Sequence, residues 1–371
     1  MKIAVLTFHR AYNCGAMLQA WAFKTALERL GHEVLFPACN HVGEVPRWRF
    51  QPSRQYLEPS GLKAFVHDVV ANVMSIGADD ANRANHTAFR HRFLPEVECA
   101  VTELSHMFDM IVIGSDQVWN PYIAKGDTAL FLAETIGNGV PTVTYAASAG
   151  DKDLTASQLE RIVCAARRCR AVSVREQMLV NTLQDGGIGN VALSLDPTLL
   201  LDGADFNVIC CDDLTPNEPY VFLYAVNASR FILDTARLFA REAGVKLVVA
   251  SPYQYSRFRA PKEILWGVSA DRMVSLVRNA RFVLGASFHG TALPLVLKVP
   301  FVSLVENRTG GIGRQESLLA NIGLSRRCFC PGMDFEDVRP LLDSAEDLKC
   351  CPKLDELKAS SWDYIRAFCN G

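Results

Sequence analysis

Short apolar runs of strand length alternate with longer segments of helical periodicity along most of this 371-residue chain. The strand-like runs lie at residues 2–8, 32–36, 110–114, 142–146, 171–174 and 191–195, and then at 220–225, 245–250, 281–285 and 301–305. Alternation of this kind builds parallel sheets that carry helices on both faces. The pattern therefore predicts an α/β fold with two doubly wound, Rossmann-like domains.

The boundaries follow from where the alternation is interrupted. Residues 1–200 are predicted to form the N-terminal domain, with a helical insertion at about 41–106. Prolines and acidic residues concentrate after this block, so residues 201–219 are read as a linker. Residues 220–371 are predicted to form the C-terminal domain and a terminal helix. In such domains ligands bind beyond the carboxyl ends of the strands, which makes the strand-end loops the place to search.

Composition narrows the function classes. The formal net charge is −2 and the basic residues are spread along the chain, so a nucleic-acid partner is not expected. No apolar run has the length of a membrane span. The first residues contain too few apolar side chains for a signal peptide. The twelve cysteines form no Cys-x-x-Cys pair and have no zinc-ligand spacing. We expect reduced thiols, a cytoplasmic location and no bound metal.

One histidine stands where a strand-like run becomes a helix-like run. His289 follows Ser287 and precedes Gly290 and Thr291. The first N–H groups of a helix are unpaired and its dipole favours negative charge, so this junction suits an anion. Histidine changes charge near neutral pH and can act as an acid or base. A packed or helix-capping histidine is the alternative reading.

Two loops of the N-terminal block are richer in polar residues than a connection requires. The first carries Asn13 and Gly15, with Gln19 one turn into the following helix, and its amides could cradle an anion or a hydroxyl of the sugar acceptor. This loop lacks the glycine spacing of a dinucleotide site and the lysine of a P-loop, so NAD and NTP chemistry are disfavoured. The second follows an apolar strand and offers hydroxyl, carboxylate, amide and indole groups for a sugar, on Ser115, Asp116, Gln117, Trp119 and Asn120. The alternatives are a turn with a helix cap for the first loop and an Asp-capped turn with a packed tryptophan for the second.

Two arginines are candidates for anion binding. Arg175 lies where the strand at 171–174 gives way to a helix, and Arg314 ends a glycine-rich loop before another helix. A planar guanidinium suits a carboxylate or phosphate. The alternative for Arg175 is a salt bridge to Glu176 or a neighbouring acid. The alternative for the loop before Arg314 is a plain surface loop.

Taken together, these segments resemble the polysaccharide pyruvyl transferase family. The matching stretches are Thr7…Asn13-Cys-Gly-Ala16…Leu18-Gln19-Ala20, Ile113-Gly-Ser-Asp-Gln-Val-Trp-Asn120, Ser173-Val-Arg-Glu176, Leu195-Asp-Pro-Thr-Leu-Leu200 and Ser287-Phe-His-Gly-Thr291…Val299-Pro300. The resemblance implies two domains arranged as in type-B glycosyltransferases. It implies transfer of pyruvate from phosphoenolpyruvate to two hydroxyls of a sugar as a cyclic ketal, in cell-surface or exopolysaccharide biosynthesis.

The resemblance also assigns roles to residues and partners. The family's histidine corresponds to His289, and its arginine after a strand corresponds to Arg175. Phosphoenolpyruvate would be the co-substrate, with no separate cofactor, and Ser287, Gly290, Thr291 and Arg314 would help to hold it. The acceptor would be a sugar or a lipid-linked oligosaccharide, and a lipid-linked acceptor would bring peripheral association with a membrane. The sequence does not reveal the oligomeric state.

The chain departs from the family at one position. Many members carry a second arginine two positions before the histidine, where this chain has Ser287. Loss of that cation would weaken anion binding by roughly 1.5–3 kcal/mol, unless Arg314 substitutes for it. Two other functions therefore stay open: a glycosyltransferase that uses a nucleotide sugar, with Glu306 as its nucleotide-binding acid, and a catalytically decayed glycan-binding protein.

Overall fold

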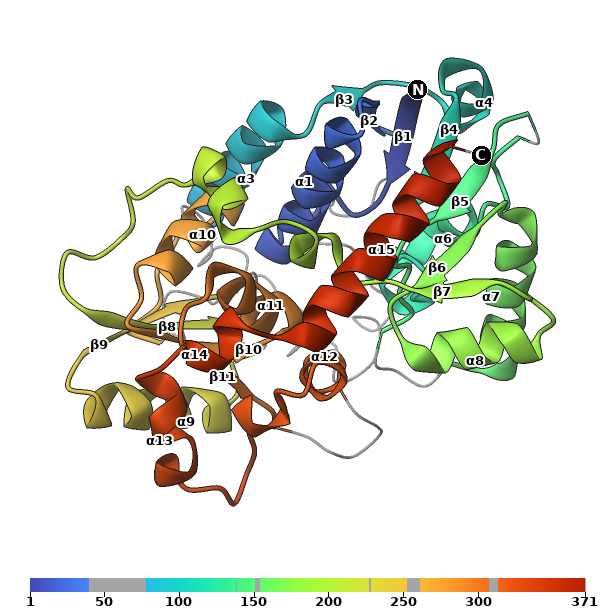
Figure 1. The fold of residues 1–371 in the computed structure, drawn as a ribbon. Helices are drawn as coiled ribbons and strands as arrows, with labels where there is room; N and C mark the ends of the chain where they lie inside the picture. Colours follow the sequence, from blue (N-terminus) through green and yellow to red (C-terminus); the bar gives the residue numbers. More distant parts are fainter. Residues whose placement is uncertain are drawn as a thin grey trace, which may run out of the picture.

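Two parallel sheets dominate the computed structural model, which describes residues 1–39, 78–137, 139–150, 154–226, 228–251, 261–306 and 313–370 (Figure 1). The first sheet has the strand order β3-β2-β1-β4-β5, and the second has the order β12-β11-β10-β8-β9. Every pairing between neighbouring strands in both sheets is parallel. The two Rossmann-like domains predicted from the alternation are confirmed.

The strands of the first sheet are β1 (Lys2–Leu6), β2 (Glu33–Pro37), β3 (Glu96–Val97), β4 (Met110–Ile113) and β5 (Thr142–Thr144). Strands β6 (Val172–Val174) and β7 (Val191–Leu193) pair with each other and continue this sheet through isolated bridges to the β5 segment. The second sheet consists of β8 (Tyr220–Ala225), β9 (Lys246–Ala250), β10 (Phe282–Ala286), β11 (Phe301–Leu304) and β12 (Cys328–Phe329).

The helices of the N-terminal part are α1 (Cys14–Arg29), α3 (Ala78–Phe93), α4 (Leu104–Met107), α5 (Pro121–Ala124), α6 (Thr128–Phe131), α7 (Ala156–Arg168) and α8 (Gln177–Asp185). Those of the C-terminal part are α9 (Arg230–Glu242), α10 (Ala270–Arg278), α11 (Phe288–Leu297), α12 (Arg314–Asn321), α13 (Phe335–Leu342), α14 (Glu346–Lys349) and α15 (Pro352–Asn370). Among the helices in these described ranges, none has both the length and the apolar character needed to cross a bilayer.

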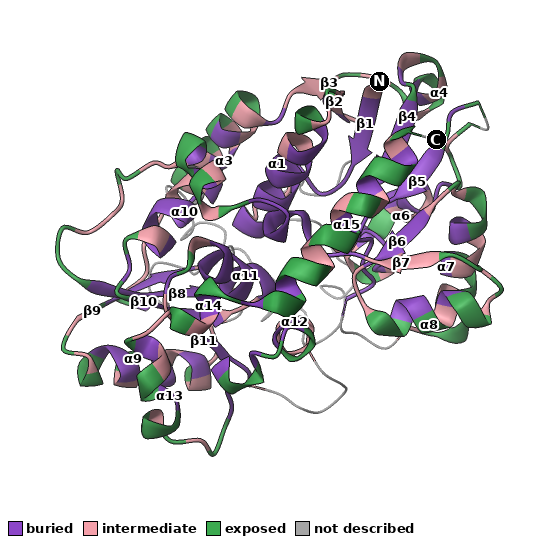
Figure 2. Ribbon diagram, in the orientation of Figure 1, coloured by how far each residue is buried: buried purple, intermediate pink, exposed green. Residues whose placement is uncertain are grey.

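Strands β4 and β8, in the interior of the two sheets, are buried along their whole length. All four residues of β4 and all six of β8 are buried, as expected for strands covered by helices on both faces. Helices α1 and α11 are buried almost throughout and lie between the two sheets (Figure 2). Their side chains belong to one hydrophobic cluster that includes residues of both sheets. A continuous core therefore joins the domains.

The order of the strands reverses once in each sheet. Strand β1 lies between β2 and β4, and β8 lies between β9 and β10. Ligand sites of doubly wound sheets form at such reversals, beyond the carboxyl ends of the strands. The chain leaves β1 toward α1 and β10 toward α11, so these two junctions are placed where a site is expected.

The terminal helix α15 crosses back over the N-terminal domain (Figure 1). Tyr364 donates its hydroxyl hydrogen to the carbonyl of Thr144 at 2.9 Å, and Ser361 Oγ accepts from the amide of Leu195 at 3.0 Å. The helix predicted for the chain end is present, and its contacts are with the first sheet and its loops. The division at residues 200 and 220 stays a prediction. Of the insertion at about 41–106, residues 40–77 lie outside the described ranges, and α3 follows them.

Candidate functional site

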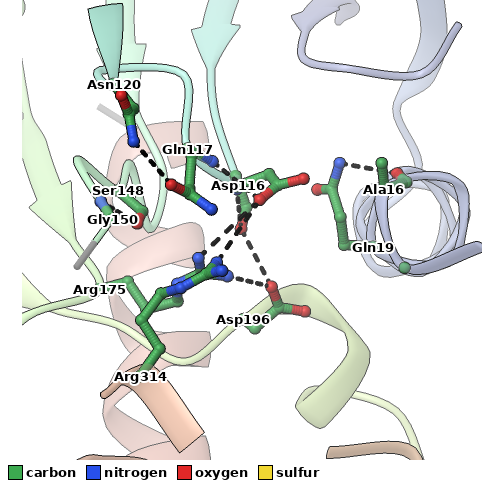
Figure 3. Close-up of polar contacts among 12 residues, drawn as sticks. Ala16, Gln19, Asp116, Gln117, Asn120, Ser148, Gly150, Arg175, Asp196 and Arg314 are labelled. Atoms are coloured by element: carbon green, nitrogen blue, oxygen red, sulfur yellow. Dashed lines mark hydrogen bonds and ion pairs between the residues drawn. The ribbon is translucent and has the colours of Figure 1, made fainter. Parts of the chain in front are cut away.

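The carboxyl ends of β4, β6, β7 and β10 bring charged side chains of both domains into one cluster (Figure 3). Asp116 follows β4, Arg175 follows β6 and Asp196 follows β7. The C-terminal domain adds His289 from the start of α11 and Arg314 from the start of α12. Residues more than one hundred positions apart in sequence thus share a site.

Asp196 is the centre of this cluster. Its Oδ2 accepts from Arg175 Nη1 at 2.7 Å and from Ser115 Oγ at 3.4 Å, and lies 3.5 Å from His289 Nε2. Its Oδ1 accepts from the amide of Thr198 at 3.0 Å and also from the Thr198 hydroxyl. Burial alone would raise the pKa of the Asp196 carboxyl, but His289, Arg175 and Thr198 outweigh burial and hold this pKa well below its usual range. Asp196 is therefore an ionised carboxylate.

Arg175 is buried, with a side chain only 6% exposed. Besides the bond to Asp196, its Nη2 lies 3.9 Å from Asp116 Oδ1 and its Nε lies 3.7 Å from Glu176 Oε1. Among the described residues, neither of these two nitrogens has a hydrogen-bond partner. Burial would lower the pKa of the guanidinium, but Asp196, Glu176 and Asp116 raise it. Arg175 is thus a fixed cation with unused donors.

Arg314 approaches the same place from the other domain. Its Nη1 lies 3.9 Å from Asp116 Oδ1, and Figure 3 shows the Arg314 and Arg175 side chains converging on Asp116. Both guanidinium carbons lie over the ring of Phe288, at 4.5 Å for Arg175 and 6.0 Å for Arg314. With its amide oxygen turned toward Arg314, Gln117 accepts from Arg314 Nη2 at 2.8 Å. Two cations therefore flank one aromatic ring.

His289 is held between the domains. Its Nε2 faces Asp196, and its ring lies edge-on to Phe288 with the centroids 5.2 Å apart. A Cβ on Gly15 would lie 2.1 Å from His289 Nδ1, so the start of α1 packs directly against the imidazole. Only glycine fits at position 15 without displacing the ring.

A pocket opens beside Arg175, between the end of β7, helix α12 and the start of α15. Its polar lining comprises Arg175, Glu176, Ser194, Asp196, Arg314, Ser317 and Asn321, and its apolar lining comprises Leu193, Leu195, Leu199, Phe288, Leu318 and Leu357. The hydroxyl of Ser194 is buried and has no hydrogen-bond partner among the described residues. The pocket thus combines cations and an unused hydroxyl with an apolar wall.

The predicted anion site at the start of α11 has a different structure. Ser287 is the N-cap, and its Oγ accepts from the amide of Gly290 at 3.1 Å. The amide of Thr291 donates to the carbonyl of Ser287, and the Thr291 hydroxyl pairs with Ser303 Oγ at 2.9 Å. The amides of Gly290 and Thr291 therefore have partners within the protein: the serine cap holds the first, and the helical bond to the Ser287 carbonyl holds the second. That these two residues bind the donor stays a prediction.

Several predicted acceptor residues support the loops rather than face an open site. Asn13 caps α1 by accepting from the amides of Gly15 and Ala16. Trp119 is buried and donates its indole N–H to the carbonyl of Phe131, so it packs in the core, as the alternative reading of this loop held. Asn120 is buried and caps α5.

Other residues of these loops lie closer to the charged cluster. Gln19 donates to Thr7 Oγ1 at 2.8 Å, and its buried Oε1 has no hydrogen-bond partner in the described ranges. Ser115 contacts Asp196, Asp116 contacts both arginines, and Gln117 lies beside Arg314. Asp196 and Phe288 were missed as site residues. Both residues lie inside motifs that the sequence had already indicated: Asp196 begins the Asp-Pro-Thr after β7, and Phe288 lies between Ser287 and His289.

Comparison with known structures shows the same fold. The UDP-GlcNAc 2-epimerase of Methanocaldococcus jannaschii matches with a TM-score of 0.51 and 12% sequence identity, over 100% of both chains. The UDP-N-acetylglucosamine 2-epimerase of Rickettsia bellii matches with a TM-score of 0.50 and 10% identity, over 100% of this chain and 95% of the other. At these identities the likeness concerns the fold alone: two Rossmann-like domains in the type-B glycosyltransferase arrangement, with a C-terminal helix.

Sequence comparison gives the family. No curated protein matches the chain in sequence. The pattern of the polysaccharide pyruvyl transferase family, however, matches residues 13–308. That span contains Arg175, Asp196 and His289 and covers most of the chain. The protein therefore belongs to the polysaccharide pyruvyl transferase family, a family of transferases.

Proposed function

We propose that this protein transfers pyruvate from phosphoenolpyruvate to two hydroxyls of a sugar, forming a cyclic ketal in cell-surface or exopolysaccharide biosynthesis. One observation carries the proposal: Arg175 of the N-terminal domain and Arg314 of the C-terminal domain flank the same Phe288 ring beside His289. Two guanidinium groups suit a small donor that carries both a carboxylate and a phosphate.

The unused donors indicate how the donor is held. Arg175 keeps its 2.7 Å bond to Asp196, which orients the guanidinium, while Nε and Nη2 have only carboxylates at 3.7 and 3.9 Å. Those distances are too long for hydrogen bonds, so a donor carboxylate can bind there without breaking one. Arg314 then takes the phosphate. This arrangement supports the idea that Arg314 replaces the arginine absent at Ser287.

The chemistry moves two protons: the two sugar hydroxyls lose one each, and the methylene carbon and the departing phosphate gain one each. A proton on the methylene carbon of phosphoenolpyruvate turns it into a methyl group and makes the central carbon electrophilic. The first sugar hydroxyl attacks that carbon and loses its proton, phosphate leaves, and the second hydroxyl attacks, loses its proton and closes the ketal. His289 is the proposed proton-transfer group. Neither a metal nor a separate cofactor takes part in the proposed reaction.

The acceptor is proposed to lie along the loop after β4. Asp116 and Gln117 are partly exposed there and adjoin the arginines, whereas Trp119 and Asn120 are buried beneath them. A sugar or lipid-linked oligosaccharide is the proposed partner, and a lipid-linked one brings the protein to a membrane surface. The reaction is proposed to take place in the cytoplasm.

The donor site is tested by titrating phosphoenolpyruvate into the protein by calorimetry. Arg175→Ala is expected to weaken binding roughly 10- to 150-fold, the loss of about 1.5–3 kcal/mol from a charged hydrogen bond. Arg241→Ala, at an exposed arginine of α9, is the matched control and should bind as the wild type does. Arg175→Lys keeps a charge beside buried Asp196 and serves if the alanine variant does not fold. Equal affinity in wild type and both folded Arg175 variants rules out the proposed clamp.

Turnover is tested by phosphate release from phosphoenolpyruvate with a panel of lipid-linked and nucleotide sugars. His289→Gln, shown to be folded, is expected to lose this activity, and undiminished pyruvylation would remove His289 from the chemistry. Stabilisation by UDP or GDP but not by phosphoenolpyruvate would instead favour the glycosyltransferase. Glycan binding with no turnover of any donor would favour the decayed binding protein.

A further inference from the structure

Asp196 contacts charged groups of both domains, and the proposed reaction gives it no role so far. Its Oδ2 faces Arg175 Nη1 at 2.7 Å and His289 Nε2 at 3.5 Å. We infer that Asp196 is a positioning residue that fixes the tautomer of His289. Nε2 makes no hydrogen bond within the described residues, but the ionised carboxylate is the group that it faces, so the ring hydrogen is held on Nε2 and Nδ1 is left as the nitrogen that exchanges protons with the substrate. The inference about the substrate rests on the proposed function, whereas the inference about the tautomer does not.

The carboxylate is fixed in a way that suits this role. Thr198 donates both its amide and its hydroxyl hydrogen to Oδ1, so Oδ2 is the oxygen directed at His289. Arg175 and Ser115 also donate to Oδ2, and the low pKa of the Asp196 carboxyl keeps it an acceptor across the physiological range. An ionised carboxylate can only accept, so the imidazole nitrogen that faces it must carry the hydrogen.

The other imidazole nitrogen, Nδ1, faces the start of α1. A Cβ on Gly15 would lie 2.1 Å from it, so only the backbone of a glycine fits beside this nitrogen. The neutral imidazole would therefore present a lone pair at the junction of α1 and α11, and the imidazolium would present a proton there.

Asp196→Asn separates positioning from packing because the two side chains have the same shape. Thr198 donates two hydrogens to Oδ1, and its backbone amide cannot turn away, whereas the Arg175 guanidinium that donates to Oδ2 has two other carboxylates at 3.7 and 3.9 Å to turn to. The asparagine carbonyl is therefore expected in the Oδ1 place and its NH₂ in the Oδ2 place. That NH₂ would donate to Nε2 and force the hydrogen of the neutral ring onto Nδ1. The lone pair at the reacting position would then be lost. The expected fall in kcat is on the order of 10³- to 10⁴-fold, as for an inverted histidine tautomer in other enzymes.

The experiment is nitrogen NMR of the full-length protein labelled with ¹⁵N-histidine, at a pH where the ring is neutral. His289→Gln identifies the His289 signals among those of the eight histidines. The wild type is expected to carry its hydrogen on Nε2, and Asp196→Asn is expected to carry it on Nδ1. Asp116→Asn is the matched control, because Asp116 lies 3.9 Å from Arg175 and, within the described part of the chain, forms no hydrogen bond or ion pair with His289. His289 should have the wild-type tautomer in this variant.

Either of two results overturns the inference. One is a wild-type signal with the hydrogen on Nδ1, which needs no variant and so does not depend on whether Asp196→Asn folds. The other is an unchanged tautomer in folded Asp196→Asn. The spectra are recorded without substrate. If they match the expectation while no phosphate is released from phosphoenolpyruvate, the proposed function fails and the positioning role stands.

Discussion

Two of the contacts between the domains differ in character, one charged and one uncharged. The charged contact consists of Asp116, Arg175, Asp196, His289 and Arg314, described above. The uncharged contact consists of Cys14, Asn82, Asn85 and His86 of the N-terminal domain with Gly267 and Val268 of the C-terminal domain. Helices α3 and α10 lie close together at this second contact (Figure 1).

In the uncharged contact, backbone and side-chain polar groups are hydrogen-bonded to each other across the two domains. The amide of Gly267 donates to Asn82 Oδ1 at 2.6 Å, and its carbonyl accepts from Asn85 Nδ2 at 2.7 Å. Cys14 donates its thiol hydrogen to the carbonyl of Val268, and burial raises the pKa of that thiol to about 12, so the group is neutral. The charged contact instead leaves two nitrogens of Arg175 without hydrogen bonds. The uncharged contact therefore pairs its polar groups across the domains, and the charged contact leaves two donors without hydrogen bonds.

Gly15 follows Cys14 of the uncharged contact and packs against His289 of the charged contact. We expect Gly15→Ala to have a large effect on kcat. The new Cβ would lie 2.1 Å from His289 Nδ1, so either the ring or the start of α1 must move. A displacement of about 1 Å at a reacting group costs on the order of 100-fold in rate. We expect at least that loss in kcat for phosphate release. Gly126→Ala is the control, since nothing lies within 4 Å of its added Cβ; equal activity of the two variants would show that the imidazole position is not critical.

Arg314→Ala removes one cation of the charged contact from the C-terminal side. We expect phosphoenolpyruvate affinity to fall roughly 10- to 150-fold, as for a charged hydrogen bond, with little change in unfolding free energy. Arg230→Ala is the matched control, because Arg230 is also the first residue of a helix but its side chain is 96% exposed. Calorimetry measures both. If Arg314→Ala binds the donor normally, Arg314 does not replace the arginine missing at Ser287.

Sequence reasoning found the architecture because it depends on local patterns. Strand-length apolar runs and helical periodicity repeat along the chain, and parallel sheets follow from their order. The same reasoning placed Arg175 and His289 at strand ends, and the structure brings both to Asp196. It could not choose between a ligand and a salt bridge for Arg175, because that depends on which acids other strands bring near. In the structure Arg175 has both an ion pair and unused donors.

What sequence could not supply was the direction of side chains at the helix starts. Ser287 and Asn13 fold back onto the amides of their own helices, so both residues are helix caps. Trp119 turns into the core, where its N–H finds a backbone carbonyl. The sequence did not indicate Asp196 as a site residue because Asp196 is recognised by its proximity to His289. That histidine lies 93 positions away in sequence and in the other domain. Pairings between distant strand ends require the fold itself.

His86 tests the uncharged contact through pH. Burial lowers the pKa of His86 to about 4, from an ordinary value of 6.5, although hydrogen bonding to Asn82 opposes this. Below about pH 6.5 the unfolded chain therefore binds a proton at this residue, and the folded protein does not. The free energy of unfolding falls as the pH falls from 6.5 toward 4. At pH 5 the loss from this group is roughly 2 kcal/mol. Urea unfolding at pH 7 and pH 5 measures the free energy of unfolding, and its loss between the two pH values should be correspondingly smaller in His86→Gln than in the wild type. An equal loss in both proteins would mean that His86 is not held neutral.

Ser287→Ala asks whether the start of α11 belongs to the ligand site or only to the scaffold, and its effect should be the smallest. Removing the cap from Gly290 should lower the unfolding free energy by about 1 kcal/mol. Ser229→Ala removes the equivalent cap of α9, away from the charged contact, and should cost a similar amount. Because the Gly290 amide is occupied by the cap, neither variant should change the affinity for phosphoenolpyruvate by more than about twofold, which is within ~0.4 kcal/mol. A selective loss of affinity in Ser287→Ala would place this serine in contact with the donor and extend the charged contact to the first turn of α11.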